Sequence, residues 1–301
     1  MESNIEEKME NFNITRFGQA LKCHFLVSRK SWIRLFGIYT LVMFVANLFF
    51  TRVAGWSYSK MEELYQGKEL VTEYTHLVYQ TTGFCMIFFG FAMLFGASYM
   101  FAQMKDTRKR SAYLLWPVSN SEKYIISLLH SIILMAIITV VSIVAADALR
   151  VLIDAITGRV FVWGVPLYGK YFSSGPEWQE MLMVVTWMFY FHSLYIIGGT
   201  LFRRFQFLST SITIATVVIL LMILFAQIGW DNIDFNLWYY EPTGEVYKLS
   251  DGRTIDIMRA VYNPSFYFAI LGAWLVIAAH YWASFKLFCR IQVINNKWLN
   301  V

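Results

Sequence analysis

The sequence predicts an all-α membrane protein with six transmembrane helices, on three observations. Of the 301 residues, 57% are hydrophobic and only 15% are charged, against about 25% charged residues in soluble domains. Six apolar segments each approach the roughly 20 residues that a helix needs to cross a hydrocarbon core of about 30 Å. The basic residues gather on one side of these segments. A soluble fold of this length could not bury so much apolar surface.

The first 31 residues predict an amphipathic entry helix. They begin acidic and turn basic, and Phe17, Leu21 and Phe25 recur at near-helical spacing. We expect this helix to lie along the membrane surface with its cations near lipid phosphates. An ordinary solvated helix is the alternative.

The six apolar segments form the predicted transmembrane domain, residues 32–285. They cover residues 32–50, 81–103, 124–148, 181–201, 208–228 and 265–285. An even number of crossings places both termini on one side, and residues 286–301 then form a tail there. The fourth and fifth segments are joined by a tight helical hairpin around Arg203 and Arg204.

The charge distribution predicts the orientation. The side with the termini, residues 105–123 and the Arg203–Arg204 turn carries 16 Lys and Arg against 6 Asp and Glu, whereas the other side carries 9 against 14. Because basic residues stay in the cytoplasm, the first side is predicted to be cytoplasmic. The three outer loops, residues 51–80, 149–180 and 229–264, have about 30 residues each. The third contains two alternating runs around Ser250-Asp251-Gly252, which predict a β-hairpin.

One run resembles a nucleotide-binding loop. Gly164 to Lys170 matches the spacing G-x4-G-K, but Tyr171 follows where a Ser or Thr would hold magnesium, and no strand precedes the run. We therefore expect no nucleotide site in this chain. The sequence also has no H-E-x-x-H motif, no cysteine pair and no carboxylate cluster at the depth of the intramembrane histidines, so we expect no metal and no cofactor. Asn13-Ile14-Thr15 fits a glycosylation acceptor, but it lies on the predicted cytoplasmic side. Cys23, Cys85 and Cys289 do not suggest a disulfide framework.

Polar residues inside the apolar segments are the candidates for intramembrane chemistry. His130, His192 and His280 lie there, and ionisable groups in a membrane are costly enough to suggest function. Hydrogen bonding between helices is the alternative that we favour. We expect His130 and His280 near the inner leaflet, where they can meet, and His192 near mid-depth.

A second polar group ends the third segment. Asp147, Arg150 and Asp154 are spaced three and four residues apart. This spacing places them on one helical face, where we expect an ion-paired helix end.

Residues 105–123 form the cytoplasmic loop between the second and third segments. Lys105, Arg108, Lys109 and Arg110 are placed to anchor this loop to anionic lipid. Leu114-Leu115-Trp116-Pro117, the apolar turn, follows, and Pro117 disfavours helix at Trp116. Ser119-Asn120-Ser121-Glu122 then predicts a capping box that starts the third membrane helix.

This loop resembles a family. The run Arg108–Lys123, RKRSAYLLWPVSNSEK, is similar to the leucine-proline-x-serine-x-x-glutamate-lysine stretch of the membrane (permease) subunits of type-2 ABC exporters. Pro117, Ser119, Glu122 and Lys123 match, while Trp116 stands between the leucines and the proline. The six segments and the entry helix match the topology of that family. Its outer loops are often concentrated between the last two segments, whereas here they are spread over three connections.

The resemblance implies a function and partners. In that family the first cytoplasmic loop seats in a groove of a separate ATPase subunit. Residues 112–123 would then be the ATPase contact, and the entry helix, Phe12–Lys30, would support it. The implied contact residues are Leu115, Trp116, Pro117, Ser119, Glu122 and Lys123. Two membrane subunits, identical or paired, would work with two ATPases in the bacterial cytoplasmic (inner) membrane.

We therefore expect an exporter permease without catalytic residues, whose substrate the sequence does not identify. It would contact lipid and protein partners but no nucleic acid. One alternative is a non-transporting, multi-pass assembly or immunity protein that docks partners through the same loop. Another is an intramembrane enzyme that uses His130, His192 or His280.

Overall fold

The computed structural model describes residues 12–54, 58–101, 107–173, 178–202, 204–228, 237–248 and 254–290. Six of its helices are long and apolar enough to cross a membrane, so the predicted class of multi-pass helical membrane protein is confirmed. The helices and strands, in order, are α2 (Ile14–Phe49), the π-helix η1 (Phe50–Ala54), α3 (Tyr58–Leu64), α4 (Lys68–Ser98), α5 (Thr107–Leu114), α6 (Asn120–Leu129), the π-helix η3 (His130–Leu134), α7 (Met135–Ile156), α8 (Val165–Ser173), α9 (Trp178–Leu201), α10 (Gln206–Ile228), β1 (Trp238–Lys248), β2 (Thr254–Tyr262) and α11 (Pro264–Cys289).

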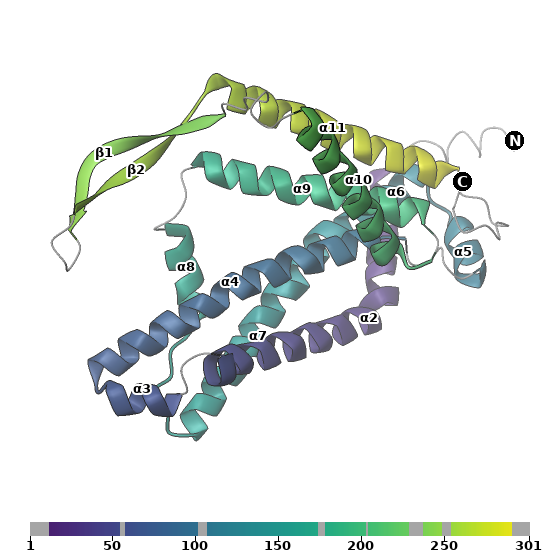
Figure 1. Ribbon diagram of the computed structural model, residues 1–301. Helices are drawn as coiled ribbons and strands as arrows, with labels where there is room; N and C mark the ends of the chain where they lie inside the picture. Colours follow the sequence, from purple (N-terminus) through teal and green to yellow (C-terminus); the bar gives the residue numbers. More distant parts are fainter. Residues whose placement is uncertain are drawn as a thin grey trace, which may run out of the picture.

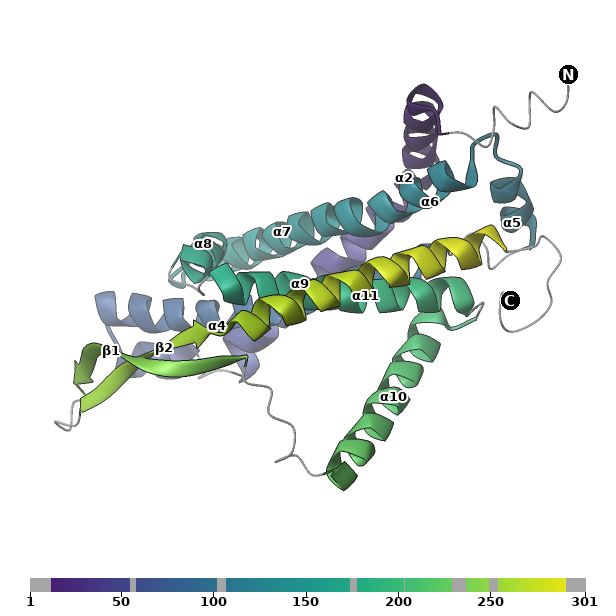
Figure 2. The same ribbon diagram turned by 90° about the horizontal axis from the view of Figure 1, so that it is seen from above.

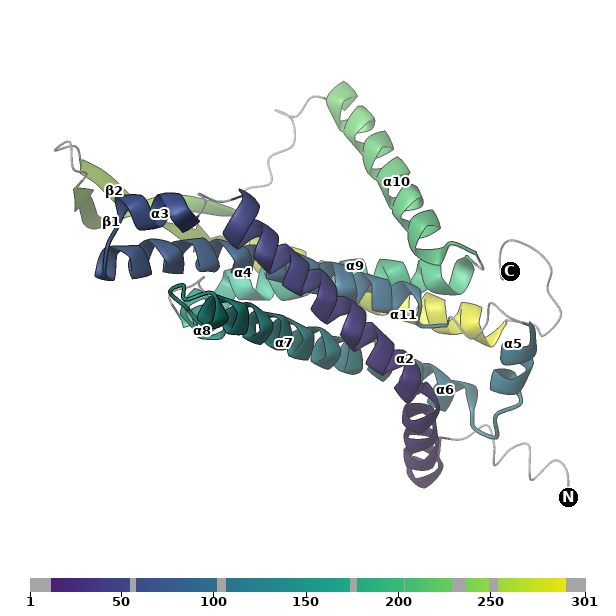
Figure 3. The ribbon, with the colours of Figure 1, turned by 90° about the horizontal axis from the view of Figure 1, so that it is seen from below.

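The predicted entry helix and first membrane segment form one continuous helix, α2. Its N-cap is Asn13, whose side chain accepts hydrogen bonds from the backbone N–H groups of Thr15 and Arg16 at 3.0 and 3.1 Å. Its first turns bend away from the remainder (Figure 3). The entry segment is therefore joined to the first membrane segment without a loop.

Two helices extend into regions that are predicted from the sequence as outer loops. Helix α4 begins at Lys68 and α7 runs to Ile156. The added part of α4 buries Leu70, Tyr74 and Val78, whose spacing of four residues marks one helical face. Average hydropathy misses this part because its other faces are polar. The connections that follow the first and third membrane segments are consequently shorter than predicted.

The long helices pack in two groups that share α4. Helices α7 and α9 pack against α4, while α2 packs against α7 and α11 packs against α9 (Figures 1 and 2). Gly96 of α4 faces Met135, and a Cβ at Gly96 would come within 2.7 Å of the Met135 Cγ. The start of α2 and the end of α11 lie at the end of the bundle that carries α5 and α6 (Figure 1).

Helix α10 and the β-hairpin lie outside this packing. Helix α10 meets α9 near its start, where Gln206 and Thr210 are buried, and then diverges from the bundle (Figures 2 and 3). Strands β1 and β2 pair antiparallel from Trp238↔Tyr262 to Lys248↔Thr254, which confirms the predicted hairpin. Its turn, residues 249–253, lies outside the described residues.

Candidate functional site

The candidate site begins at the junction of α2 with α6. The predicted capping box is present: the Ser119 hydroxyl accepts from the Glu122 backbone N–H at 3.2 Å, and the Glu122 carboxylate accepts from the Ser119 backbone N–H at 2.9 Å. This reciprocal pair satisfies two helix-end donors. It fixes where α6 begins and how the chain enters it.

The same carboxylate also binds α2. Glu122 is fully buried. It accepts from the Arg16 Nε and Nη2 at 2.9 Å each and from the Asn13 backbone N–H at 2.8 Å. An ionised carboxylate can be buried only when it is paired and hydrogen-bonded. Glu122 therefore joins two helix starts that are more than 100 residues apart in the sequence.

The apolar turn projects from this junction. Leu115 is 80% exposed, and Pro117 is exposed as well. Trp116 is half-buried and packs with Ala20 and Val118. Its ring centroid lies 6.3 Å from that of His24. One side of the turn is thus anchored on α2, while Leu115 and Pro117 face outward.

The remaining residues of the expected ATPase contact are not on this surface. Ser119, Glu122 and Lys123 have exposed fractions of 6%, 0% and 3%. The Ser119 and Glu122 side chains fix the start of α6 and join it to α2. Of the six residues implied as the contact, these three are therefore buried and do not line the exposed surface of the apolar turn.

Of the four basic residues predicted to anchor this loop to anionic lipid, the structure describes the side chain of Arg110 alone. Lys105 lies outside the described residues, and so do the side chains of Arg108 and Lys109. Arg110 is 1% exposed, so its guanidinium does not lie against lipid phosphates. Nearby, Tyr113 places its hydroxyl 2.9 Å from the Ser127 Oγ, and burial raises the pKa of this phenol to about 12.

The candidate histidines separate into two places. His130 begins the π-helix η3, and its Nδ1 lies 3.0 Å from the Nε2 of His24. His192 lies 2.8 Å from the Tyr281 hydroxyl and His280 lies 3.0 Å from the Ser193 hydroxyl. His130 therefore meets His24 rather than His280, and the other two each join α9 to α11. These contacts are the interhelical hydrogen bonds that the structural interpretation predicts.

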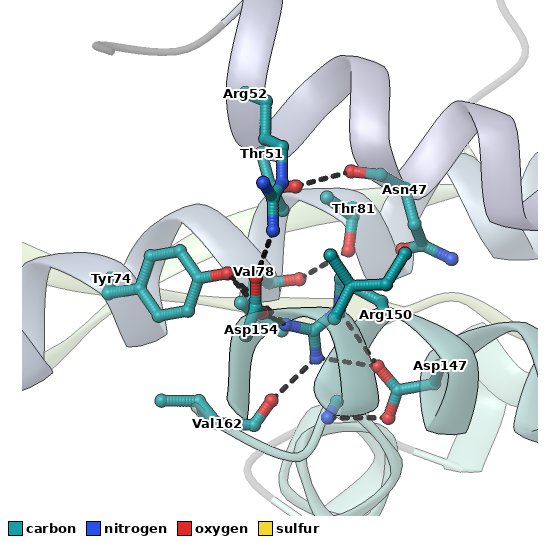
Figure 4. A network of polar contacts seen from close by, with 12 residues as sticks. Asn47, Thr51, Arg52, Tyr74, Val78, Thr81, Asp147, Arg150, Asp154 and Val162 are labelled. Atoms are coloured by element: carbon teal, nitrogen blue, oxygen red, sulfur yellow. Dashed lines mark hydrogen bonds and ion pairs between the residues drawn. The ribbon is translucent and has the colours of Figure 1, made fainter. Parts of the chain in front are cut away.

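The predicted ion-paired end of the third segment is a cluster of four charges, of which Asp147, Arg150 and Asp154 are buried and Arg52 is half-buried (Figure 4). Arg150 donates to the Asp147 Oδ1 at 2.6 Å and to the Asp154 Oδ2 at 3.0 Å. Asp154 also accepts from Arg52 at 2.7 Å and from the Tyr74 hydroxyl at 2.7 Å. The two arginines balance the two carboxylates, so the cluster is neutral. It ties the π-helix η1, which follows α2, to α4 and α7.

The nucleotide-loop-like run has a structural role next to this cluster. The backbone N–H groups of Gly164 and Val165, where α8 starts, donate to the Asp147 Oδ2 at 2.8 and 3.3 Å. Amides at a helix start favour an anion, and here the chain supplies its own carboxylate.

Comparison of the chain with protein-family models, with curated proteins and with solved structures finds no match in any of the three. The site is therefore interpreted from its own geometry.

Several residues of both polar sites were missed from the sequence. Asn13 had a usable signal, because an Asn before an apolar-periodic run is a helix-start pattern. Arg16, His24, Arg52 and Tyr74 are each paired with residues at least 76 positions away. No local pattern predicts such pairs.

Proposed function

We propose that the chain is the permease subunit of a type-2 ABC exporter in the bacterial cytoplasmic membrane. A separate subunit would hydrolyse ATP, and two copies of this chain, or this chain and a similar one, would form the transport path. The observation that supports this best is the exposed apolar turn on a buried, charge-paired junction.

The junction suits transmission of force. A partner that moves the turn acts on Leu115 and Pro117, which are exposed. The turn passes directly into α6, and Glu122 holds α6 to α2 through Arg16. A displacement of the turn would therefore reach two membrane helices at once. A flexible loop would absorb such a displacement before it reached them.

The experiment is co-purification with an ATPase encoded beside this gene, using a tag on this chain. We expect the ATPase to co-elute with the wild type and to be lost from Leu115→Arg, which places a charge in an apolar contact. The matched control is Leu64→Arg, because Leu64 is 59% exposed and its helix α3 lies at the other end of the bundle (Figure 1). Equal retention in all three proteins, or no ATPase with the wild type, contradicts the proposal.

A non-transporting assembly or immunity protein would use the same turn, so co-purification alone does not separate the two functions. Purified complex in liposomes does separate them. The exporter requires ATP-dependent movement of a substrate across the liposome membrane. Stable docking with no ATP-dependent flux of any cellular lipid or peptide extract tested would favour the assembly protein.

A further inference from the structure

A cavity of about 330 Å³ lies between α4, α7 and α8. Its walls include Met86 and Phe89 of α4, Ile143 and Val144 of α7, and Val165 and Tyr168 of α8. Tyr168 alone among these six carries a polar group. The cavity is partly open, and Val144 on its wall is 41% exposed. It is therefore an apolar recess that a flexible molecule can enter from the side.

The polar cluster beside the recess holds helix α8 over it. Asp147 holds the start of α8 through the N–H groups of Gly164 and Val165, and Arg150 in turn holds Asp147. A Cβ at Gly164 would lie 3.0 Å from the Asp147 Oδ1, so glycine allows this close approach. Tyr168 packs against the core around Cys85 and Ile143. The position of α8 over the recess is thus set before any ligand arrives.

The depth of the recess along α7 indicates whether lipid or water surrounds it. Val144 precedes Arg150 by six residues, which corresponds to about 9 Å along a helix. The recess therefore lies about two helical turns from the polar cluster, toward the middle of the membrane-spanning helix. It is bordered by α4 and α7, which both have membrane-spanning length and hydropathy. Val144 also lies inside the apolar segment 124–148 that the sequence predicts to cross the membrane, so we expect hydrocarbon around this position.

The apolar walls determine which kind of molecule the recess can bind. Water needs two to four polar partners to remain in a cavity, and these walls are almost entirely apolar. An unfilled apolar void is unfavourable by about 24 cal/mol per Å³. An acyl chain arrives from lipid and gains little from the hydrophobic effect. Contact with pre-set walls would supply its affinity, because dispersion contacts accumulate over a chain.

We propose that this recess binds one acyl chain of a membrane lipid as a saturable ligand, distinct from the lipid that surrounds the protein. The uncharged walls of the recess suit an uncharged acyl chain. Because the recess lies next to the polar cluster, the acyl chain would enter it from the membrane leaflet on the Asp147 side. This inference does not depend on the exporter proposal. It applies equally to a non-transporting membrane protein.

The test uses the full chain in liposomes of phosphatidylethanolamine and phosphatidylglycerol that contain a phospholipid with a diazirine in its acyl chain. After illumination, mass spectrometry maps the adducts. We expect labelling at Met86 and Tyr168 that saturates as the probe fraction rises. Val144→Trp fills the recess and should abolish this saturable labelling. The matched control is Val141→Trp, because Val141 is 49% exposed on the same helix and is not on the wall.

Three results would overturn the proposal. The first is labelling that rises linearly with the probe fraction, as it does for surrounding lipid. The second is equal labelling in Val144→Trp and Val141→Trp. The third is cross-linking of the wall residues to a second protein chain in place of lipid. If Val144→Trp does not fold, Val165→Trp fills the same recess from α8 and is judged by the same criteria.

Discussion

At the scale of single residues, Glu122 explains most about this molecule. Its carboxylate completes a capping box that can be recognised in four consecutive residues of the sequence. It also forms an ion pair with Arg16 of helix α2. The first role could be predicted because capping is local. The second could not, because residues 106 positions apart meet only through the packing of whole helices.

We predict that Arg16→Ala destabilises the protein by roughly 2–3 kcal/mol, below the ~3–5 kcal/mol for a fully buried pair, because the Arg16 side chain is 22% exposed. Adding Glu122→Gln should restore part of the loss, since the amide oxygen still accepts hydrogen bonds without a buried charge. Lys22→Ala, at an exposed position of α2, is the control. Thermal unfolding in detergent measures all of them, and an unchanged Arg16→Ala would show that the pair contributes nothing.

Arg150 tests whether the ion pairs of the other polar cluster also stabilise the protein. Arg150→Met would leave Asp147 and Asp154 without their shared partner, and we expect a loss of about 3–5 kcal/mol. Adding Asp154→Asn should recover part of it, because one unpaired charge is removed. Arg204→Met, on an exposed residue, should change stability little. A loss no larger than that of Arg204→Met in thermal unfolding would mean that the cluster is not structural.

At the scale of elements, helix α9 depends on two adjacent glycines. A Cβ at Gly199 would come within 2.5 Å of the Ser98 carbonyl oxygen of α4. A Cβ at Gly198 would collide with Thr210 of α10. Glycine at these positions lets α9 approach both neighbours closely, as small residues do between membrane helices.

We therefore predict that Gly199→Ala destabilises the protein by about 1–3 kcal/mol, the usual range for overpacking. The new methyl group would clash with the Ser98 backbone carbonyl, which cannot rotate away as a side chain can. Gly90→Ala is the control, since a Cβ there meets nothing within 4 Å, and it should be neutral or stabilising by up to about 1 kcal/mol. Comparison of the two midpoints of thermal unfolding decides the matter. Equal midpoints would contradict the close packing of α9 on α4.

The elements also show what hydropathy can and cannot predict. All six long helices were predicted because a membrane segment must satisfy its own backbone hydrogen bonds over a length set by the bilayer. The extension of α4 before residue 81 was missed. It is amphipathic and carries Glu69 and Glu73 beside the buried Leu70 and Tyr74. Periodicity detects such a segment where average hydropathy does not.

At the scale of the whole molecule, the charge difference between the two sides predicts the orientation. Cys23 is exposed near the start of α2, and Thr254 is exposed on the hairpin. In a variant without Cys85 and Cys289, we expect a membrane-impermeant maleimide to label Cys23 only after the cells are permeabilised. A Thr254→Cys substitution in a chain without Cys23 should be labelled in intact spheroplasts. The reverse pattern would invert the topology and place the apolar turn outside the cell.

The proposal that the apolar turn docks an ATPase is tested most directly by photo-cross-linking in cells. Benzoylphenylalanine at position 115 should form an adduct with an ATPase that carries a phosphate-binding loop, identified by mass spectrometry. The same residue at position 141, on the exposed side of α7, should not form it. A cross-link from position 115 to such an ATPase is the predicted result. Adducts with lipid alone, or the same adducts from both positions, would contradict it.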